Sequence, residues 1–248
     1  WHVQFINLLK TRGSSAKVGN DQTGQTILSL SYVNKNTNTY WFGNSQQAYS
    51  GYDEGQIGDS DVTWETATKK NIGFDINMWD NKIVLQVDAF NELRTGILMQ
   101  RQTIPYVTGF FPWILPYGNL GKVKNHGRDA SLKIQNHVSP DHVYYSFMAN
   151  FTYAHNTVLE NDEAPPLYPY QSGKGHSIGA PYGLVATGLF KDQQEIDQSP
   201  LQSFSSVVYP GDIKFKDVNG DGVINSYDYM YLKGYPRTPE ITYGFGGT

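Results

Sequence analysis

The sequence predicts an all-β fold, in which about six antiparallel strands form a segment of a transmembrane β-barrel with long extracellular loops. Three observations lead to this prediction. Apolar and polar side chains alternate with a period of two through several long stretches. Turns of a few residues alternate with much longer connections. The 248 residues include 25 Gly, 18 Tyr, 12 Phe and 5 Trp, a composition that favours strands and turns over helices.

The first three predicted strands are residues 4–17, 63–78 and 82–98. The alternation is clearest in the second, where Ile72, Phe74 and Ile76 are separated by Gly73 and Asp75. The tripeptide WDN at 79–81 is a turn that joins the second strand to the third. The strand at 4–17 has a shorter pattern and precedes this hairpin.

A second hairpin repeats the plan with predicted strands at 121–137 and 142–156. The sequence VSPD at 138–141 supplies the turn between them. A last strand is predicted at 239–248, where PEITYGFGGT alternates again. The two short turns are expected on the same side of the sheet.

The other three connections, 18–62, 100–119 and 158–238, are long and rich in Gly, Asn, Tyr and Pro. Loops this long are uncommon in compact domains and are usually functional. Short turns on one side and long loops on the other are typical of outer-membrane barrels. One side-chain set is then expected to face lipid: Ile72, Phe74, Ile76, Leu85, Val87, Phe147 and Phe151. Another is expected to face the lumen: Asp75, Asn77, Gln86, Asp88 and Asn150.

Alternation alone also fits a soluble β-sandwich, in which the apolar set fills a core and the polar set meets water. Such a fold would serve as a carbohydrate-binding or adhesion module. The asymmetry of the loops favours the barrel.

Composition excludes several classes of function. The formal net charge is −4, which argues against a nucleic-acid partner because nucleic-acid binders carry basic patches. The absence of cysteine excludes disulfides and thiol chemistry. The chain has no apolar run long enough for a transmembrane helix.

The stretch DVNGDGVINSYD at 217–228 has the spacing of a calcium-binding loop. Gly222 occupies the sixth position, where a sharp turn is needed, and Ca²⁺ prefers about 6–8 oxygen ligands. The loop lies in the longest connection, so the ion is expected to stiffen that connection. The same residues also suit an Asx-rich turn without metal. The predicted ligands are Asp217, Asn219, Asp221, the Val223 carbonyl, Asn225 and Asp228.

Two tryptophans in the long connections are candidates for substrate binding. Trp41 lies in YWF at 40–42, and Trp113 lies in GFFPWILPY at 109–117. Exposed aromatic rings stack on sugars or grip a partner protein. The alternative for either residue is packing of one loop against another.

Other functions have weaker support. A dockerin module would need two loops like that at 217–228, and the sequence has one. A glycoside hydrolase needs two converging carboxylates, and no pair is singled out. No Ser–His–Asp pattern or histidine metal motif occurs, so the chain is not expected to be an enzyme.

Several phrases occur in one order along the chain, and together they resemble the SusC/RagA family of TonB-dependent outer-membrane transporters. The most specific joins the calcium-type loop to GYPRTPEITYG at 234–244. The others are LKTRGSSAKVGN (9–20), TWETATKKNIGFDINMWDNKIVLQVDAFNELRTGIL (63–98), GNLGKVKNHGRDASL (118–132) and YPYQSGKGHSIGAPYGLVATGLF (168–190).

The resemblance implies a barrel of about 22 strands in the outer membrane of a Gram-negative bacterium. It also implies a plug domain, a SusD-like surface lipoprotein as a lid, and import of oligosaccharides or peptides driven by the TonB–ExbB–ExbD complex. Residues 1–248 are expected to be part of the barrel domain, without the plug and the final strands.

Overall fold

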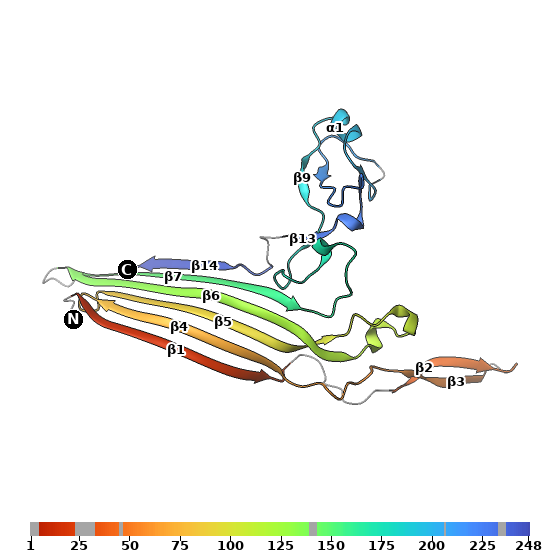
Figure 1. Ribbon diagram of the computed structural model, residues 1–248, viewed down its shortest axis with the longest axis horizontal. Coiled ribbons are helices and arrows are strands. Elements are labelled where there is room, and N and C mark those ends of the chain that lie inside the picture. Colours follow the sequence, from red (N-terminus) through yellow and green to blue (C-terminus); the bar gives the residue numbers. More distant parts are fainter. Residues whose placement is uncertain (1–4, 23–32, 45–46, 139–142, 206, 233–236) are drawn as a thin grey trace. The chain divides into compact units, whose positions relative to one another are not determined.

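Six long antiparallel strands form one sheet in a computed structural model of the chain (Figure 1). The structure describes residues 5–22, 33–44, 47–138, 143–205, 207–232 and 237–248. Neighbouring strands follow the order β1-β4-β5-β6-β7-β14. Their bounds are β1 Ile6–Asn20, β4 Glu65–Met78, β5 Ile83–Gln100, β6 Tyr117–Val138, β7 Val143–Glu160 and β14 Ile241–Gly247. All six predicted strands are confirmed. Because the six lie in one sheet, the sandwich alternative lacks the two sheets that it needs.

The turn between β4 and β5 falls where WDN predicts it. Trp79, Asp80 and Asn81 have φ angles of 50°, 55° and 64°, and Lys82 N donates to Trp79 O at 3.1 Å. Asn and Asp tolerate this left-handed region, whereas Trp adopts it rarely. The Trp79 ring stacks on Phe5, with 5.7 Å between centroids. The predicted turn at 138–141 lies outside the described residues, except for Val138.

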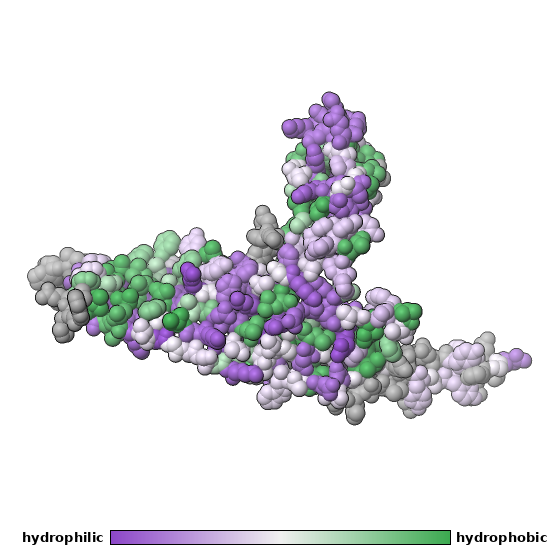
Figure 2. Space-filling model, in the orientation of Figure 1, coloured by the Kyte–Doolittle hydropathy of each residue, from purple (hydrophilic) through white to green (hydrophobic). Residues whose placement is uncertain are grey.

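The strand register places the two predicted side-chain sets on opposite faces. Phe74 lies beside Val87, Val87 beside Ala130, and Ala130 beside Phe151. This side is the apolar face. One residue along each strand, Asp75 lies beside Gln86, and Ser131 lies beside Asn150 on the polar face. On the side seen in Figure 2, hydrophobic residues gather over the end of the sheet where β4 turns into β5.

The connection between β1 and β4 contains a hairpin, although the sequence predicts a long loop there. It pairs β2 (Val33–Phe42) with β3 (Gln47–Glu54), and the register shifts between Lys35 and Thr39. The sequence of β2 is VNKNTNTYWF, in which polar residues fill both alternating positions. Without an apolar face to alternate, this strand gives no period-two signal.

Residues 165–239 form a compact unit of their own, distinct from the unit of residues 1–164 and 240–248. Three short strand pairs hold it: β8–β13, β9–β11 and β10–β12. Its buried side chains include Phe190, Gln202, Ile224 and Asp228. The strands are β8 Tyr182–Gly183, β9 Ala186–Leu189, β10 Leu201–Gln202, β11 Ile213–Phe215, β12 Val223–Ile224 and β13 Met230–Tyr231.

Helices are few and short. The α-helix α1 covers Gln193–Asp197, and Asp192 caps it by accepting a hydrogen bond from Glu195 N at 2.8 Å. No described helix is long and apolar enough to cross a bilayer. The described part of the chain also has four 3-10 helices: η1 Tyr106–Thr108, η2 Pro112–Ile114, η3 Pro169–Gln171 and η4 Ser226–Asp228.

A glycine in β6 allows close packing within the sheet. Gly127 lies beside Phe90 in the register, and Phe90 covers the space where a side chain would stand. A Cβ at Gly127 would overlap the Tyr153 carbonyl oxygen and lie 2.5 Å from Phe90 Cζ. Glycine at this position therefore lets an aromatic ring cover the backbone of the neighbouring strand.

We expect Gly127→Ala to destabilise the folded barrel by roughly 1–3 kcal/mol, because the added methyl group forces Phe90 and the β7 backbone apart. The measurement is the temperature at which the folded barrel loses its fast mobility on a denaturing gel. Gly13→Ala is the control, since no described atom lies within 4 Å of its Cβ position. An equal shift for both variants would contradict the explanation.

Candidate functional site

An ion cluster on the polar face joins β1, β4 and β5. Arg12 Nε donates to Asp75 Oδ2 at 2.9 Å, and Arg12 Nη2 donates to Asp75 Oδ1 and Asp88 Oδ2, both at 2.8 Å. A Cβ at Gly73 would overlap the Asp88 carboxylate, so this glycine leaves room for the cluster. Among the described residues, Asp88 Oδ1 is buried and lacks a hydrogen-bond partner. The sequence predicts both Asp75 and Asp88 on this face, but it does not predict that Arg12 binds them both.

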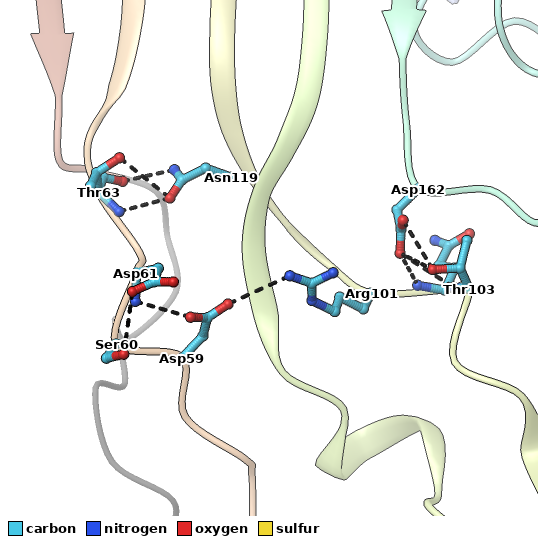
Figure 3. A network of polar contacts seen from close by, with 9 residues as sticks. Asp59, Ser60, Asp61, Thr63, Arg101, Thr103, Asn119 and Asp162 are labelled. Atoms are coloured by element: carbon cyan, nitrogen blue, oxygen red, sulfur yellow. Dashed lines mark hydrogen bonds and ion pairs between the residues drawn. The ribbon is translucent and has the colours of Figure 1, made fainter. Parts of the chain in front are cut away.

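A second polar network lies where the long connections leave the sheet (Figure 3). The Asn119 side chain in β6 accepts from Thr63 N at 2.7 Å and donates to the carbonyls of Thr63 and Gly96 at 2.8 and 2.6 Å. Gly96 has a φ of 68°, at an irregularity in the β5–β6 pairing. One amide therefore fixes the segment before β4 to the end of β5.

The same network holds the base of the connection between β5 and β6. Asp162, after β7, accepts from Gln102 N at 2.7 Å and Thr103 Oγ1 at 3.1 Å. Arg101 pairs with Asp59 at 3.7 Å, and Ile57 N donates to Ile114 O at 2.9 Å. Figure 3 shows the contacts of Asp162 and Arg101, which link residues from three connections. Polar contacts between segments far apart in sequence therefore hold the long connections together where they leave the sheet.

The tip of the 101–116 connection exposes aromatic side chains above this base. Trp113 is 69% exposed and Phe111 is 58% exposed, and their rings stack in parallel with 4.6 Å between centroids. The neighbouring Ile114 and Leu115 are buried. The loop therefore anchors itself through aliphatic residues and leaves a flat aromatic pair facing outward.

The other predicted tryptophan, Trp41, lies in strand β2 and not in an irregular loop. It is 61% exposed, next to Tyr40 at 66%. Among the described residues, no ring contact joins Trp41 to Trp113. The two candidates therefore occupy separate elements, and the structure does not bring them into one pocket.

The calcium-type loop is closed by hydrogen bonds between carboxylates and backbone N–H groups. Asp217 accepts from Gly220 N at 2.7 Å and Gly222 N at 2.8 Å, and both glycines have positive φ angles, of 77° and 84°. Asn219 Oδ1 accepts from Asp221 N at 3.1 Å, and Asp221 Oδ1 accepts from Val223 N at 2.8 Å. These bonds explain the tight turn through DVNGDG.

Asp228 is fully buried and holds the second half of the loop. Its Oδ1 accepts from Val218 N at 2.8 Å, and its Oδ2 accepts from Asn225 N at 2.9 Å. Asn225 Oδ1 in turn accepts from Tyr227 N at 2.7 Å, which caps η4. A buried carboxylate needs such donors, because burial removes its hydration.

The oxygen donors of this loop suit a hard cation such as Ca²⁺. In the part of the chain that the structure describes, however, no three His, Cys, Asp or Glu side chains form a group that could hold a metal ion. Calcium binding stays a prediction, because the expected ligands also include the amides of Asn219 and Asn225 and the Val223 carbonyl.

The loop also affects a neighbouring tyrosine. Tyr170 Oη donates to Tyr227 O at 2.8 Å. Burial raises the pKa of Tyr170, and the negative charges of Tyr168, Asp228, Asp217 and Asp221 raise it further. The three aspartates thus act together on a group outside the loop.

The sheet and its connections match a known family. The family model described as TonB dependent receptor-like, beta-barrel, matches residues 12–243. The chain belongs to this TonB-dependent receptor family. The family prediction and the barrel prediction are confirmed. The expectation that the chain is not an enzyme is confirmed too, because the relatives are named as receptors.

Two relatives come from Formosa agariphila. TonB-dependent receptor P39 is 27% identical over 88% of this chain, and TonB-dependent receptor P26 is 28% identical over 97% of it. These matches cover 23% and 24% of the relatives. The chain therefore spans about a quarter of the length of the curated relatives that it matches.

Solved structures support the same barrel fold. The chain is similar to the RagAB peptide importer in its closed-closed state, with a TM-score of 0.68 and 19% identity. The match covers the whole chain and 26% of that structure's chain. A structure of the RagAB peptide transporter matches with a TM-score of 0.68 and 20% identity over 97% of this chain and 25% of that chain.

We expect Asn119→Ala to free the 55–64 segment of this receptor-family chain. Its three hydrogen bonds give a local loss of roughly 1–3 kcal/mol. Hydrogen exchange at residues 55–64 should rise, while exchange in the middle of β4 and β5 stays slow. Asn91→Ala, an exposed change on the same sheet, is the control. Unchanged exchange at 55–64 would show that other contacts hold the segment.

Proposed function

We propose that this chain is part of the wall of a SusC-like, TonB-dependent transporter in the outer membrane of a Gram-negative bacterium. The observation that carries the proposal is the strand register, which separates an apolar from a polar face across β4, β5, β6, β7 and β14 over the half of the sheet nearer the β4–β5 turn. Family membership supports it. Import would be driven by the TonB–ExbB–ExbD complex.

The apolar face would contact outer-membrane lipid, and the polar face would line a hydrated lumen. Side chains on the apolar face are exposed in this chain, among them Ile72 at 55%, Phe74 at 42% and Phe245 at 76%. An exposed apolar face of this extent needs lipid or protein to cover it. The Arg12 cluster would lie on the lumen side, where water tolerates charge.

The long connections would meet the substrate and a SusD-like surface lipoprotein that acts as a lid. The stacked Phe111–Trp113 pair offers a flat aromatic surface for a sugar ring or an apolar peptide side chain. Trp41 offers a second exposed ring on β2. Oligosaccharides and peptides are both candidate substrates. The name of the similar RagAB peptide importer favours peptides.

The test of transport compares uptake of labelled peptide and oligosaccharide mixtures by cells that carry the complete receptor, with and without an active TonB complex. TonB-dependent accumulation of one class supports the proposal and names the substrate class. Trp113→Ala should reduce uptake more than Trp64→Ala, since Trp64 covers the backbone at Gly19. Uptake of neither class would refute import of these substrates.

A charge placed on the apolar face tests the membrane orientation. We expect Val87→Arg to impair assembly by about 2–4 kcal/mol if the residue lies near the bilayer midplane. Gln86→Arg is the matched control, because Gln86 is adjacent to Val87 in sequence but its side chain lies on the polar face, beside Asp75. Measurement is the fraction of folded barrel formed in lipid vesicles across a urea series. Equal losses for the two variants would argue against the proposed orientation.

We also propose that the 217–228 loop binds Ca²⁺ as a structural ion, through Asp217, Asn219, Asp221, Val223, Asn225 and Asp228. The donor chemistry supports it, and so does electrostatics: carboxylates drawn close together repel one another unless a cation lies among them. The ion would stiffen the loop and would take no part in chemistry.

Removal of calcium should raise protease sensitivity in residues 205–238 and leave the six long strands protected. Asp217→Ala should give the same result in the presence of calcium. Asp197→Ala, in the same unit but outside the loop, should not.

Calcium should also lower the raised pKa of Tyr170, because the ion offsets the nearby aspartate charges; absorbance titration against Tyr170→Phe measures this. No heat of calcium binding in calorimetry would reduce the loop to a hydrogen-bonded turn.

A further inference from the structure

Cations replace apolar side chains on the apolar face as the strands approach the long connections. In β6, the apolar positions Ile134, Leu132 and Ala130 are followed on the same face by Arg128 and Lys124. In β4, Ile72 is followed by Lys70. Lys17 lies on the same face of β1, two residues beyond the partner of Lys70. All four side chains are exposed. We call them the basic belt: Lys17, Lys70, Lys124 and Arg128.

The acids near the basic belt pair with other residues. Within the described residues, none of its four members forms an ion pair. Along β1, β4, β5, β6 and β7, the apolar face carries no Asp or Glu apart from Glu160 at the end of β7, which pairs with Lys122 at 3.1 Å. Glu240, which precedes β14, reaches the same face and contacts His155 Nδ1 at 2.5 Å, so neither acid pairs with a member of the belt. The surface is therefore positive, although the whole chain has a net charge of −4.

The polar face at the same level is built differently. Glu92 pairs there with Lys69 at 3.7 Å and with Arg94 at 2.6 Å. Further down the strands, Arg12 pairs with Asp75 and Asp88. The sequence balances charge on one face and leaves it unbalanced on the other, although both faces share the same strands. Solubility alone does not explain this difference.

The belt lies at the height where a bilayer ends. On the apolar face of β7, His155 lies ten residues beyond Tyr145. His155 is at the level of the belt, because its partner in β6 is His126, which lies between Lys124 and Arg128 on the same face. At roughly 3.3 Å per residue this is about 33 Å along the strand. A tilt of about 40° reduces it to roughly 25 Å of height, which matches the apolar band of outer-membrane barrels.

We propose that the basic belt binds the phosphate groups of a lipid headgroup in the outer leaflet of the membrane. The inference rests on the proposed membrane orientation, in which the apolar face meets lipid and the long connections lie outside the cell. Lys and Arg stems extend along apolar surface while their charged heads reach the headgroup layer. Phosphate oxygens accept charge-assisted hydrogen bonds from both side chains. A phosphorylated lipid therefore complements the belt in charge and adjoins the apolar band with its acyl chains.

The test uses the complete receptor in phosphatidylcholine nanodiscs, with and without lipid A as the phosphorylated lipid. The variant Lys70→Gln/Lys124→Gln removes two belt charges. The matched control Lys69→Gln/Lys133→Gln removes two charges from the polar face of the same strands, β4 and β6. Each cation near an anionic lipid surface contributes about five-fold in affinity, so the belt variant should bind lipid A roughly 25-fold more weakly. The control should change less than two-fold.

The outcomes separate this inference from the proposed function. A fluorescent label on Val87→Cys, quenched by brominated lipid, reports whether the apolar face meets lipid. Quenching together with equal lipid A affinity for the belt and control variants would overturn the inference and leave the membrane orientation intact. No quenching would overturn both. Inorganic phosphate that competes fully with lipid A would overturn the assignment to a lipid headgroup.

Discussion

The hydrogen-bonded register of the six long strands is the constraint on which the rest of the structure depends. A strand within a bilayer must satisfy its N–H and C=O groups on neighbouring strands, because lipid offers no partners. Each strand from β4 to β7 is paired on both sides. A shift of one residue would send every side chain to the other face. Val87 would then lie on the polar face, and Asp88 would lie on the apolar face.

Close contacts within the sheet support this register. Gly127 and Gly73 lie at positions where a Cβ would overlap neighbouring atoms. At Gly127 the space holds the Phe90 ring, and at Gly73 it holds the carboxylate that Arg12 binds. A slipped register would put a side chain into each space. The glycines therefore help to select one pairing, in addition to the selection made by the two faces.

Much of this fold can be read from the sequence, because period-two alternation reports strands that have two unlike faces. The strands around Phe74 and Phe147 were predictable for that reason. The β2 strand was missed because the positions that alternate with its asparagines hold Lys35, Thr37 and Thr39, so neither side is apolar. The contacts of Asn119 and Asp162 could not be predicted, since each joins segments far apart in the chain and sequence spacing carries no information about such pairs. The aspartates at 217–228 predict a tight loop. They do not determine whether the carboxylates bind backbone N–H groups or a cation, because the same residues suit both.

The two faces of the sheet also differ in how their charged side chains are paired at the same level of the strands. Charges that line a lumen lie close to the charges of neighbouring strands, so Glu92 and Asp88 are matched with cations within the wall itself. In the proposed orientation, charges at the edge of the apolar face lie beside a layer of anionic headgroups, which can neutralise them from outside. Lys69 pairs with Glu92, and Lys70 forms no ion pair with any described residue, although the two are consecutive in sequence and differ only in the face of the strand that they occupy. Two consecutive residues of one strand can therefore have different electrostatic partners, one within the sheet and the other in the surroundings of the protein. For this reason the strand register determines the distribution of charge on the sheet as well as its hydrophobicity.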